Sequence, residues 1–270
     1  MDEYTETNRD HWNELASVNV KSDFYDVEGF KKGKLSLLPI EREELGDVTG
    51  KSLLHLQCHF GLDTLSWARL GAKVTGVDLS DKSIDLARTI SKETGIDAEF
   101  ICSDVYDLPN VLDKQFDIVF TSYGVLLWMP DLNKWASVVS HFLKPGGIFY
   151  IVELHPFVNV FDVEKDVTEL KVKYPYFHSP IPDKWESDGS YADKDAALTH
   201  ASYEWTHSMS DILNALIASG LKIEFIHEFP YCCYQRFPFM EEYKDGLYHM
   251  TGDKEKMIPL MFSLKAIKAL

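Results

Sequence analysis

The sequence lacks the long apolar runs and the cysteine pairs that mark membrane and secreted proteins. No run approaches the roughly 18 apolar residues that a membrane-spanning helix needs. The first ten residues, MDEYTETNRD, are polar and acidic, unlike a secretory signal. The four cysteines are too few and too scattered for a disulfide framework. We therefore expect a cytoplasmic protein with reduced thiols and no membrane contact.

Positive charge is also scarce. Lysine and arginine number 27 against 43 aspartate and glutamate residues, which gives a formal net charge of -16. This charge would repel a phosphate backbone, and no Lys/Arg-rich stretch with interleaved aromatic residues reverses it locally. We therefore expect a small-molecule substrate and no nucleic-acid partner. The oligomeric state stays open.

Short apolar runs alternate with helical patterns from residue 51 onward. The first segments of this alternation fall at 52–56, 62–70, 73–77, 81–94 and 98–102. Further segments follow at 116–122, 131–142 and 148–153. Strands that alternate with helices at this spacing predict an α/β fold, with a parallel sheet and helices on both of its faces.

The alternation stops at His155 and resumes near Trp205. Between them proline, tyrosine, phenylalanine and aspartate accumulate without periodicity. Because a structureless loop of this length is unusual in a compact domain, we expect short strands or helices in it and interpret it as a lid or substrate-binding insertion. A helix at 210–219 and strands at 222–228 and 258–266 then close the chain.

Acidic residues stand at the ends of two predicted strands. Asp78 follows the second strand and Asp104 the third, while the first ends in the run from Leu53 to Gly61. Ligands in doubly wound sheets bind outside the carboxyl ends of the strands, where Asp78 can accept hydrogen bonds from a ribose diol. Asp104 can accept from an exocyclic adenine amine. An isolated acid at such a place more often caps a helix, but three strand ends in register favour a ligand site.

The same segments resemble the class I, Rossmann-like methyltransferases that depend on S-adenosylmethionine. The family's opening run and second strand are similar to LLHLQCHFG and GAKVTGVDLS here, and SDVYDLP, FDIVFTSYGVLLWMPDL and LKPGG follow in order. The resemblance implies a doubly wound, mostly parallel seven-stranded sheet with an antiparallel last strand and an inserted lid. It also implies S-adenosylmethionine as cofactor, S-adenosylhomocysteine as product and a small-molecule methyl acceptor.

The resemblance also implies which residues bind the cofactor. These are Gln57, Cys58, His59, Gly61, Asp78, Leu79, Ser103, Asp104, Val105 and Ser122. The loop departs from the family because only Gly61 remains of its usual three glycines, and LQCHFG resembles the signature of a poorly characterised branch of small-molecule methyltransferases. The side chains of Gln57 and His59 must then point away from the cofactor or contact it themselves. The spacing of Cys58 and His59 does not fit a zinc site, so no metal is expected.

The methyl acceptor should lie at the end of the fifth strand. His155 is a candidate general base there, and Glu153 can orient it or bind a cationic acceptor. The alternative is that His155 only caps the strand before Pro156. His207 is a second candidate base. The candidate walls of the acceptor site are Tyr25, Tyr123 and Trp128, although Trp128 suits simple core packing equally well.

We expect four regions along the chain. They are an N-terminal helical lid at 1–49, a cofactor-binding core at 50–154, a substrate-binding insertion at 155–206, and a helix with two strands at 207–270 that completes the core. The leading hypothesis is a methyltransferase. A non-catalytic sensor that binds S-adenosylmethionine or S-adenosylhomocysteine is the alternative. An NAD-dependent oxidoreductase is disfavoured because the G-x-G-x-x-G fingerprint is missing.

Overall fold

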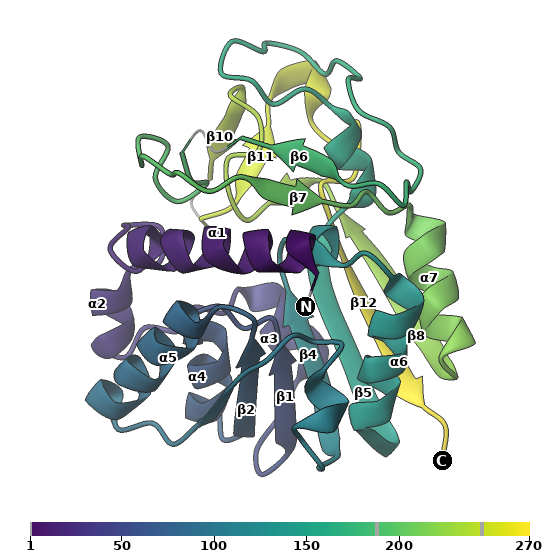
Figure 1. Cartoon of the computed structure of the whole chain (residues 1–270). Helices are drawn as coiled ribbons and strands as arrows, with labels where there is room; N and C mark the ends of the chain where they lie inside the picture. The colour runs from purple at the N-terminus through teal and green to yellow at the C-terminus, as the bar shows by residue number, and fades with distance from the viewer. Residues whose placement is uncertain (1, 187–188, 244–245) are drawn as a thin grey trace.

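A seven-stranded sheet forms the centre of the protein. The computed structural model describes residues 2–186, 189–243 and 246–270. The strands of the sheet are β1 (Ser52–Leu56), β2 (Lys73–Asp78), β3 (Glu99–Cys102), β4 (Phe116–Ser122), β5 (Leu143–Leu154), β8 (Leu221–Phe229) and β12 (Met261–Lys268). They lie in the order β3-β2-β1-β4-β5-β12-β8, and β12 runs antiparallel to both neighbours. The predicted α/β fold, mostly parallel with an antiparallel last strand, is confirmed (Figure 1).

The order of the strands reverses beside β1. This strand pairs in parallel with β2 on one side and with β4 on the other, because the chain adds β2 and β3 on one side and then returns to add β4 on the other. A crevice forms at the carboxyl ends of the strands at such a reversal, and ligands bind there. The chain leaves β1 at Gln57, while Asp78 ends β2 and Ser122 ends β4. All three lie at this edge of the sheet.

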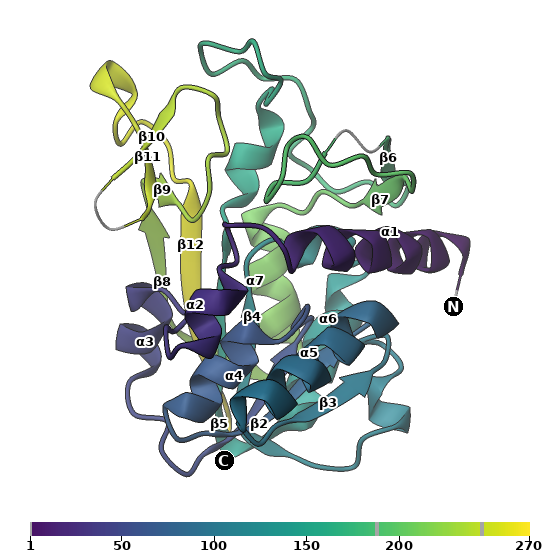
Figure 2. The same ribbon diagram turned by 90° about the vertical axis from the view of Figure 1, so that its left-hand side faces the viewer.

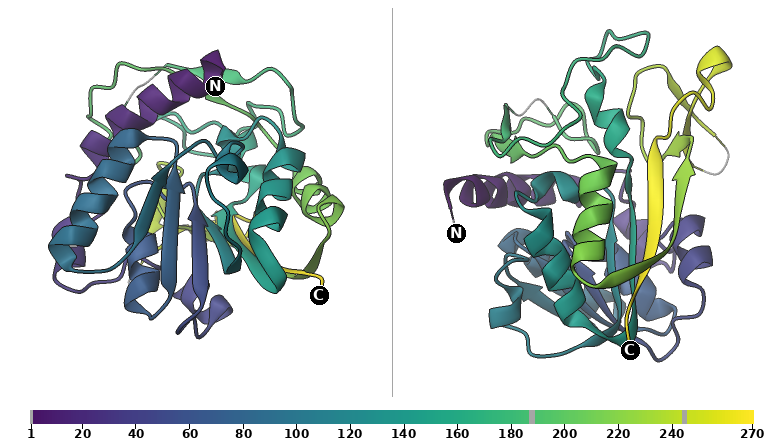
Figure 3. Two further views of the ribbon diagram at one scale, coloured as in Figure 1. Left: turned by 60° about the horizontal axis from the view of Figure 1, so that its bottom comes forward. Right: turned by 90° about the vertical axis from the view of Figure 1, so that its right-hand side faces the viewer.

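Helices cover both faces of the sheet (Figure 3). One face packs on α3 (Pro39–Leu45) and α4 (Leu62–Arg69), and the other on α6 (Leu132–Phe142) and α7 (Met209–Ala218). In α6 the buried residues Trp135, Val139 and Phe142 recur at helical spacing, and the Asp131 carboxylate caps the first turn. None of the described helices is both long and apolar enough to cross a membrane.

A helix and two small sheets lie above the carboxyl ends of the central strands. Helix α1 (Glu3–Asn19) runs across these ends, below the pair formed by β6 (Asp183–Trp185) and β7 (Ser202–Glu204) (Figure 1). The Asn8 side chain joins the two layers, because it donates to the carbonyl of Tyr203 and accepts from its N–H, each at 2.8 Å. The edge of the sheet that carries the predicted site is therefore covered.

The segment between β8 and β12 contains a three-stranded sheet that the sequence pattern did not predict. It consists of β9 (Tyr231–Cys232), β10 (Met240–Glu242) and β11 (Tyr248–Met250), in the order β10-β11-β9. Strands of two or three residues are too short to show an alternation of apolar and polar residues. This small sheet rises beside the 3-10 helix η3 (Pro156–Val160), which follows β5 (Figure 2).

Candidate active site

The loop between β1 and α4 contains three alternate residues in the left-handed conformation. Their φ angles are 57° at Gln57, 49° at His59 and 77° at Gly61. Glycine adopts this conformation freely, whereas an L-residue with a side chain pays about 1–2 kcal/mol for it. The loop therefore keeps a glycine-like backbone although two of the three positions carry side chains. Strain of this kind persists where the surrounding structure enforces it, often at ligand sites.

The side chain of Gln57 is fixed at one end and unpaired at the other. Its amide nitrogen donates to the carbonyl of Val125 at 3.0 Å. Its amide oxygen is buried and has no hydrogen-bond partner among the described residues. Exchanging the two amide atoms would turn an oxygen toward that carbonyl, so the contact with Val125 fixes the orientation. The loop thus presents one free buried acceptor, which costs about 1–3 kcal/mol while no donor meets it.

His59 ties the loop to β2 and to α1. Its N–H donates to the carboxylate of Asp78 at 2.7 Å, and its ring nitrogens lie 3.0 Å from the Ser83 hydroxyl and 3.3 Å from the Asn19 amide. Burial lowers the pKa of His59 to about 3, so the ring is neutral at physiological pH. His59 therefore serves as a neutral hydrogen-bonding group inside the covered edge.

Asp78 and Asp104 lie at successive strand ends. Asp78 also accepts from the N–H of Ser80 at 2.9 Å, and burial raises its pKa to about 6 despite these hydrogen bonds. Asp104 accepts from the N–H of Tyr106 at 2.8 Å through one carboxylate oxygen, and burial raises its pKa as well. Because each carboxylate oxygen can accept more than one hydrogen bond, both acids can still receive ligand hydroxyl or amine donors.

Five further predicted cofactor residues lie in different surroundings. Cys58 and Val105 are buried among apolar side chains of two core clusters, so their side chains pack in the core. Ser103 donates to its neighbour's carbonyl, at Asp104, and Ser122 to the carboxylate of Asp63 at 3.3 Å. Leu79, the other predicted residue, follows Asp78 and is half-buried.

Aromatic side chains from α1 and from the loop after β4 close over His59. The Trp12 ring lies 5.2 Å from the His59 ring and 5.3 Å from that of Trp128, and the Trp128 indole donates to the carbonyl of Gly124 at 2.7 Å. The Asn13 amide oxygen accepts from the hydroxyl of Ser80, two residues after Asp78, at 2.6 Å. Helix α1 is thus fastened over the edge that carries Asp78 (Figure 2).

Tyr25 and Tyr123 both lie near Asp63 and Cys233. The Tyr25 ring lies 5.5 Å from the ring of His59, and its hydroxyl bonds to that of Tyr191. Tyr123 has a left-handed backbone, with a φ of 31°, and its hydroxyl donates to Glu41 at 3.1 Å.

Glu153 holds the loop after β4 and does not contact His155. Its buried carboxylate accepts from the N–H of Gly124, from that of Val125 at 2.7 Å and from that of Leu126 at 3.2 Å. This loop supplies the carbonyl of Val125 that fixes Gln57. Glu153 therefore positions the neighbours of the cofactor loop.

The two candidate histidines lie in different surroundings. His155 accepts from the N–H of Phe157 at 3.1 Å, which caps η3, and its other nitrogen lies 2.9 Å from Glu228 on β8. The geometry favours the capping alternative. The Nε2 of His207 lies 2.7 Å from the carbonyl of Met129, and burial lowers the pKa of His207 to about 4.

A small pocket at the carboxyl end of β5 is lined by Leu126, Leu127, Glu153, Leu154, Pro156, Asn159, His207 and Ile212.

Two acids beside the site, one buried and one half-buried, were missed from the sequence. Glu41, fully buried on α3, has its pKa raised to about 8 by burial and then by the charge of Asp63. Asp63 accepts from the Ser36 hydroxyl at 2.6 Å, and burial raises its pKa. Asp63 stands two residues after Gly61, so its place next to the cofactor loop could have been predicted from the sequence. Nothing in the sequence pattern around Glu41 predicts that Glu41 is buried. No group of three His, Cys, Asp or Glu side chains within the described parts of the chain is placed to hold a metal ion.

Residues 54–151 match the protein family described as "Methyltransferase domain". Among curated proteins, the ubiquinone biosynthesis O-methyltransferase of Xanthomonas euvesicatoria is 31% identical over 135 residues, which are 49% of this chain and 56% of that protein. The first curated relatives are matched over 47% to 62% of their own length, so this chain spans little more than half of them.

Solved structures share the fold at lower identity. An S-adenosylmethionine-dependent methyltransferase from Mesorhizobium loti has a TM-score of 0.57 and 21% identity, over 88% of this chain and 100% of that chain. The cyclase SpnF has a TM-score of 0.58 and 16% identity, over 99% of this chain and 96% of that chain. These likenesses show the fold alone, and SpnF is named for another reaction. Residues 54–151 therefore match a methyltransferase domain, and the chain shares the fold of solved methyltransferases.

Proposed function

We propose that the protein transfers the methyl group of S-adenosylmethionine to a small-molecule acceptor and releases S-adenosylhomocysteine. The observation that carries this proposal is the loop from Gln57 to Gly61, which keeps three alternate left-handed residues and is hydrogen-bonded to Asp78. The left-handed backbone at Gln57 and His59 is strained, and strain of this kind is retained where a ligand site requires it.

The residues at this edge fit the groups of the cofactor. In this proposal Asp78 accepts from the ribose hydroxyls and Asp104 from the adenine amine. The buried amide oxygen of Gln57 lacks a donor, and the cofactor's ammonium group is a donor of the right charge. The aromatic side chains of Trp12 and Trp128 exclude water from above. Gln57 thus supplies through its side chain a contact that a glycine at this position lacks.

The bound cofactor supplies an electrophilic methyl group on a sulfonium sulfur. Transfer needs the acceptor held in line with this group, which is a matter of positioning. A base is required only if the acceptor must lose a proton. His207 is the better-supported candidate, because it lines the pocket at the end of β5 while His155 caps η3. Glu153 acts by holding the loop that carries Tyr123, a candidate wall of the acceptor site.

The name of the curated relatives supports an oxygen atom as the acceptor. The other regions suit this role: α1 covers the cofactor edge, and the insertion after residue 155 lies above it (Figure 1). We infer that both form the lid of the acceptor site.

Methyl transfer itself must be measured, since the same fold serves a cyclase. Incubation of the full chain with methyl-labelled S-adenosylmethionine and a deproteinised cell extract should place label in a small molecule and form S-adenosylhomocysteine. Heat-denatured protein is the control. If the cofactor binds but no label moves from it, the chain is a sensor and the proposed function is wrong.

A further inference from the structure

A half-buried arginine lies in the upper layer without an acidic partner in contact. Arg236 lies in the segment between β9 and β10, and its two terminal nitrogens donate to the Tyr234 hydroxyl and to the Asn159 amide oxygen, each at 3.1 Å. Its Nε is buried and unpaired, and within the described residues no carboxylate lies within 4 Å of the guanidinium. Both partners are neutral, so the charge is held in place but not neutralised.

This arrangement is costly unless an anion completes it. A buried charge without a counter-ion is strongly unfavourable, and two neutral oxygens compensate it only in part. Arginine has five N–H donors, of which two are used here, so three remain, and Nε–H is one of them. A guanidinium with free adjacent donors matches a carboxylate in a two-point contact.

Glu204 on β7 is the nearby acid, but it does not pair with the Arg236 guanidinium. The charge of Arg236 acts on Glu204, but the two groups form no ion pair, and burial raises the pKa of Glu204 to about 7. Near neutral pH this carboxyl is therefore only partly ionised. The cation still lacks a full negative charge beside it.

Contacts connect Arg236 both to the loop after β1 and to the pocket at the end of β5. The ring of Tyr234, which holds one end of the guanidinium, lies 6.1 Å from the ring of Tyr191, whose hydroxyl bonds to Tyr25 beside His59. At the other end, Asn159 belongs to η3 and lines the pocket that contains Glu153 and His207. Arg236 thus stands between the loop that would hold the cofactor and the end of β5.

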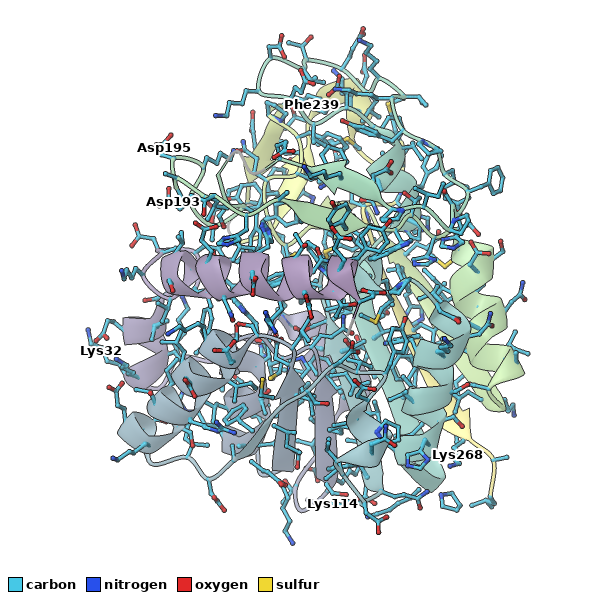
Figure 4. All side chains as sticks on the ribbon, viewed as in Figure 1. Lys32, Lys114, Asp193, Asp195, Phe239 and Lys268 are labelled. Carbon is cyan, nitrogen blue, oxygen red and sulfur yellow. The ribbon has the colours of Figure 1, made fainter. Side chains whose placement is uncertain are left out.

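The molecule as a whole is acidic, with 43 acidic against 27 basic residues. In Figure 4, Asp193 and Asp195 are labelled on the upper layer, while Lys114 and Lys268 lie at the opposite end of the molecule.

We propose that Arg236 binds a carboxylate on the methyl acceptor, so that the substrate class is small organic acids. The inference rests on the proposed methyl transfer, because it assigns one end of that reaction's acceptor. A carboxylate suits the site better than a phosphate, since a single guanidinium balances one negative charge. Tyr191 and Tyr234 beside it provide apolar ring faces for the body of such an acid.

The labelled product formed from methyl-labelled S-adenosylmethionine and a deproteinised extract tests this inference. The product should be retained by an anion-exchange resin at pH 7 and released at about pH 2, because a carboxyl group loses its charge below a pKa of about 4. A labelled product, other than unreacted S-adenosylmethionine, that stays unbound at pH 7 would contradict a carboxylate on the acceptor. A labelled product that is still retained at pH 2 would contradict it as well. No labelled product at all would instead contradict the methyl transfer on which the inference rests.

Variants separate recognition from folding. Arg236→Gln should lower the rate of labelling at least about tenfold, because one partner of a buried charge contact is removed. Arg236→Lys, which keeps the charge but loses the fork, should lie between this variant and the wild type. Lys194→Gln is the matched control, since Lys194 is exposed and contacts the neighbouring Gln235. S-adenosylhomocysteine should bind all three variants as it binds the wild type, and Arg236→Gln with a wild-type labelling rate would overturn the assignment.

Discussion

The carboxylate of Asp78 accepts a 2.7 Å hydrogen bond from the backbone N–H of His59. This contact joins the end of β2 to the loop after β1 and holds His59 in a left-handed conformation that a histidine rarely adopts. The same carboxylate is the group expected to receive the ribose of the cofactor. A structural contact and a binding group thus coincide in Asp78, so its replacement would change both, and other residues make clearer tests.

Gln57→Gly separates the backbone of the loop from the side-chain contact. Glycine removes about 1–2 kcal/mol of left-handed strain, while its greater freedom in the unfolded chain costs about 0.5–1 kcal/mol, so stability should change little. The affinity for S-adenosylhomocysteine should fall about tenfold because the acceptor for its ammonium group is gone. Calorimetry with methylthioadenosine, which lacks the amino-acid part, is the control and should show no change. Equal losses of affinity for both ligands would show that Gln57 does not contact the amino-acid part of the cofactor.

Glu41 should make the protein less stable as the pH rises. Its pKa in the folded protein, about 8, lies above the ordinary 4.5, so between these values the unfolded chain releases the proton more readily. The free energy of unfolding then falls by up to about 1.4 kcal/mol per pH unit from this group. Urea unfolding from pH 5 to 8 should show a smaller decline for Glu41→Gln than for the exposed-site control Glu43→Gln. If the free energy of unfolding falls equally with pH in both variants, Glu41 does not have a raised pKa in the folded protein.

Glu153→Gln should loosen the loop after β4. The carboxylate accepts from consecutive backbone N–H groups, and an amide would turn its own donors toward some of them. We expect a loss of about 1–3 kcal/mol in the free energy of unfolding, with slower methyl transfer. Thermal unfolding and the labelling assay measure the two effects, and an unchanged melting temperature would show that Glu153 does not hold this loop.

His155→Ala distinguishes a cap from a base. Loss of the hydrogen bond to Phe157 should cost about 1 kcal/mol of stability. The rate of methyl transfer should stay within about twofold of the wild type when the protein is folded. A large fall in the rate with unchanged cofactor affinity would restore His155 as the general base.

The sequence predicted the central sheet well because its strands are long enough to show apolar runs between helical patterns. The strand ends at Asp78 and Asp104 followed from that order. The left-handed backbone at Gln57 and His59 was not predictable from residue type, because both usually avoid this conformation. Arg236 was missed for another reason. It lies between strands of two or three residues, where no periodicity shows which side chain is buried.

Calorimetry with S-adenosylmethionine, S-adenosylhomocysteine and NAD tests whether the chain binds the methyl donor and its product. We expect both sulfur nucleotides to bind the wild type and NAD not to bind. Asp104→Ala should weaken both about tenfold or more through loss of the adenine contact, while the exposed Asp107→Ala should bind as the wild type does. Failure of both sulfur nucleotides to bind, or equal affinities of Asp104→Ala and Asp107→Ala, would contradict the account.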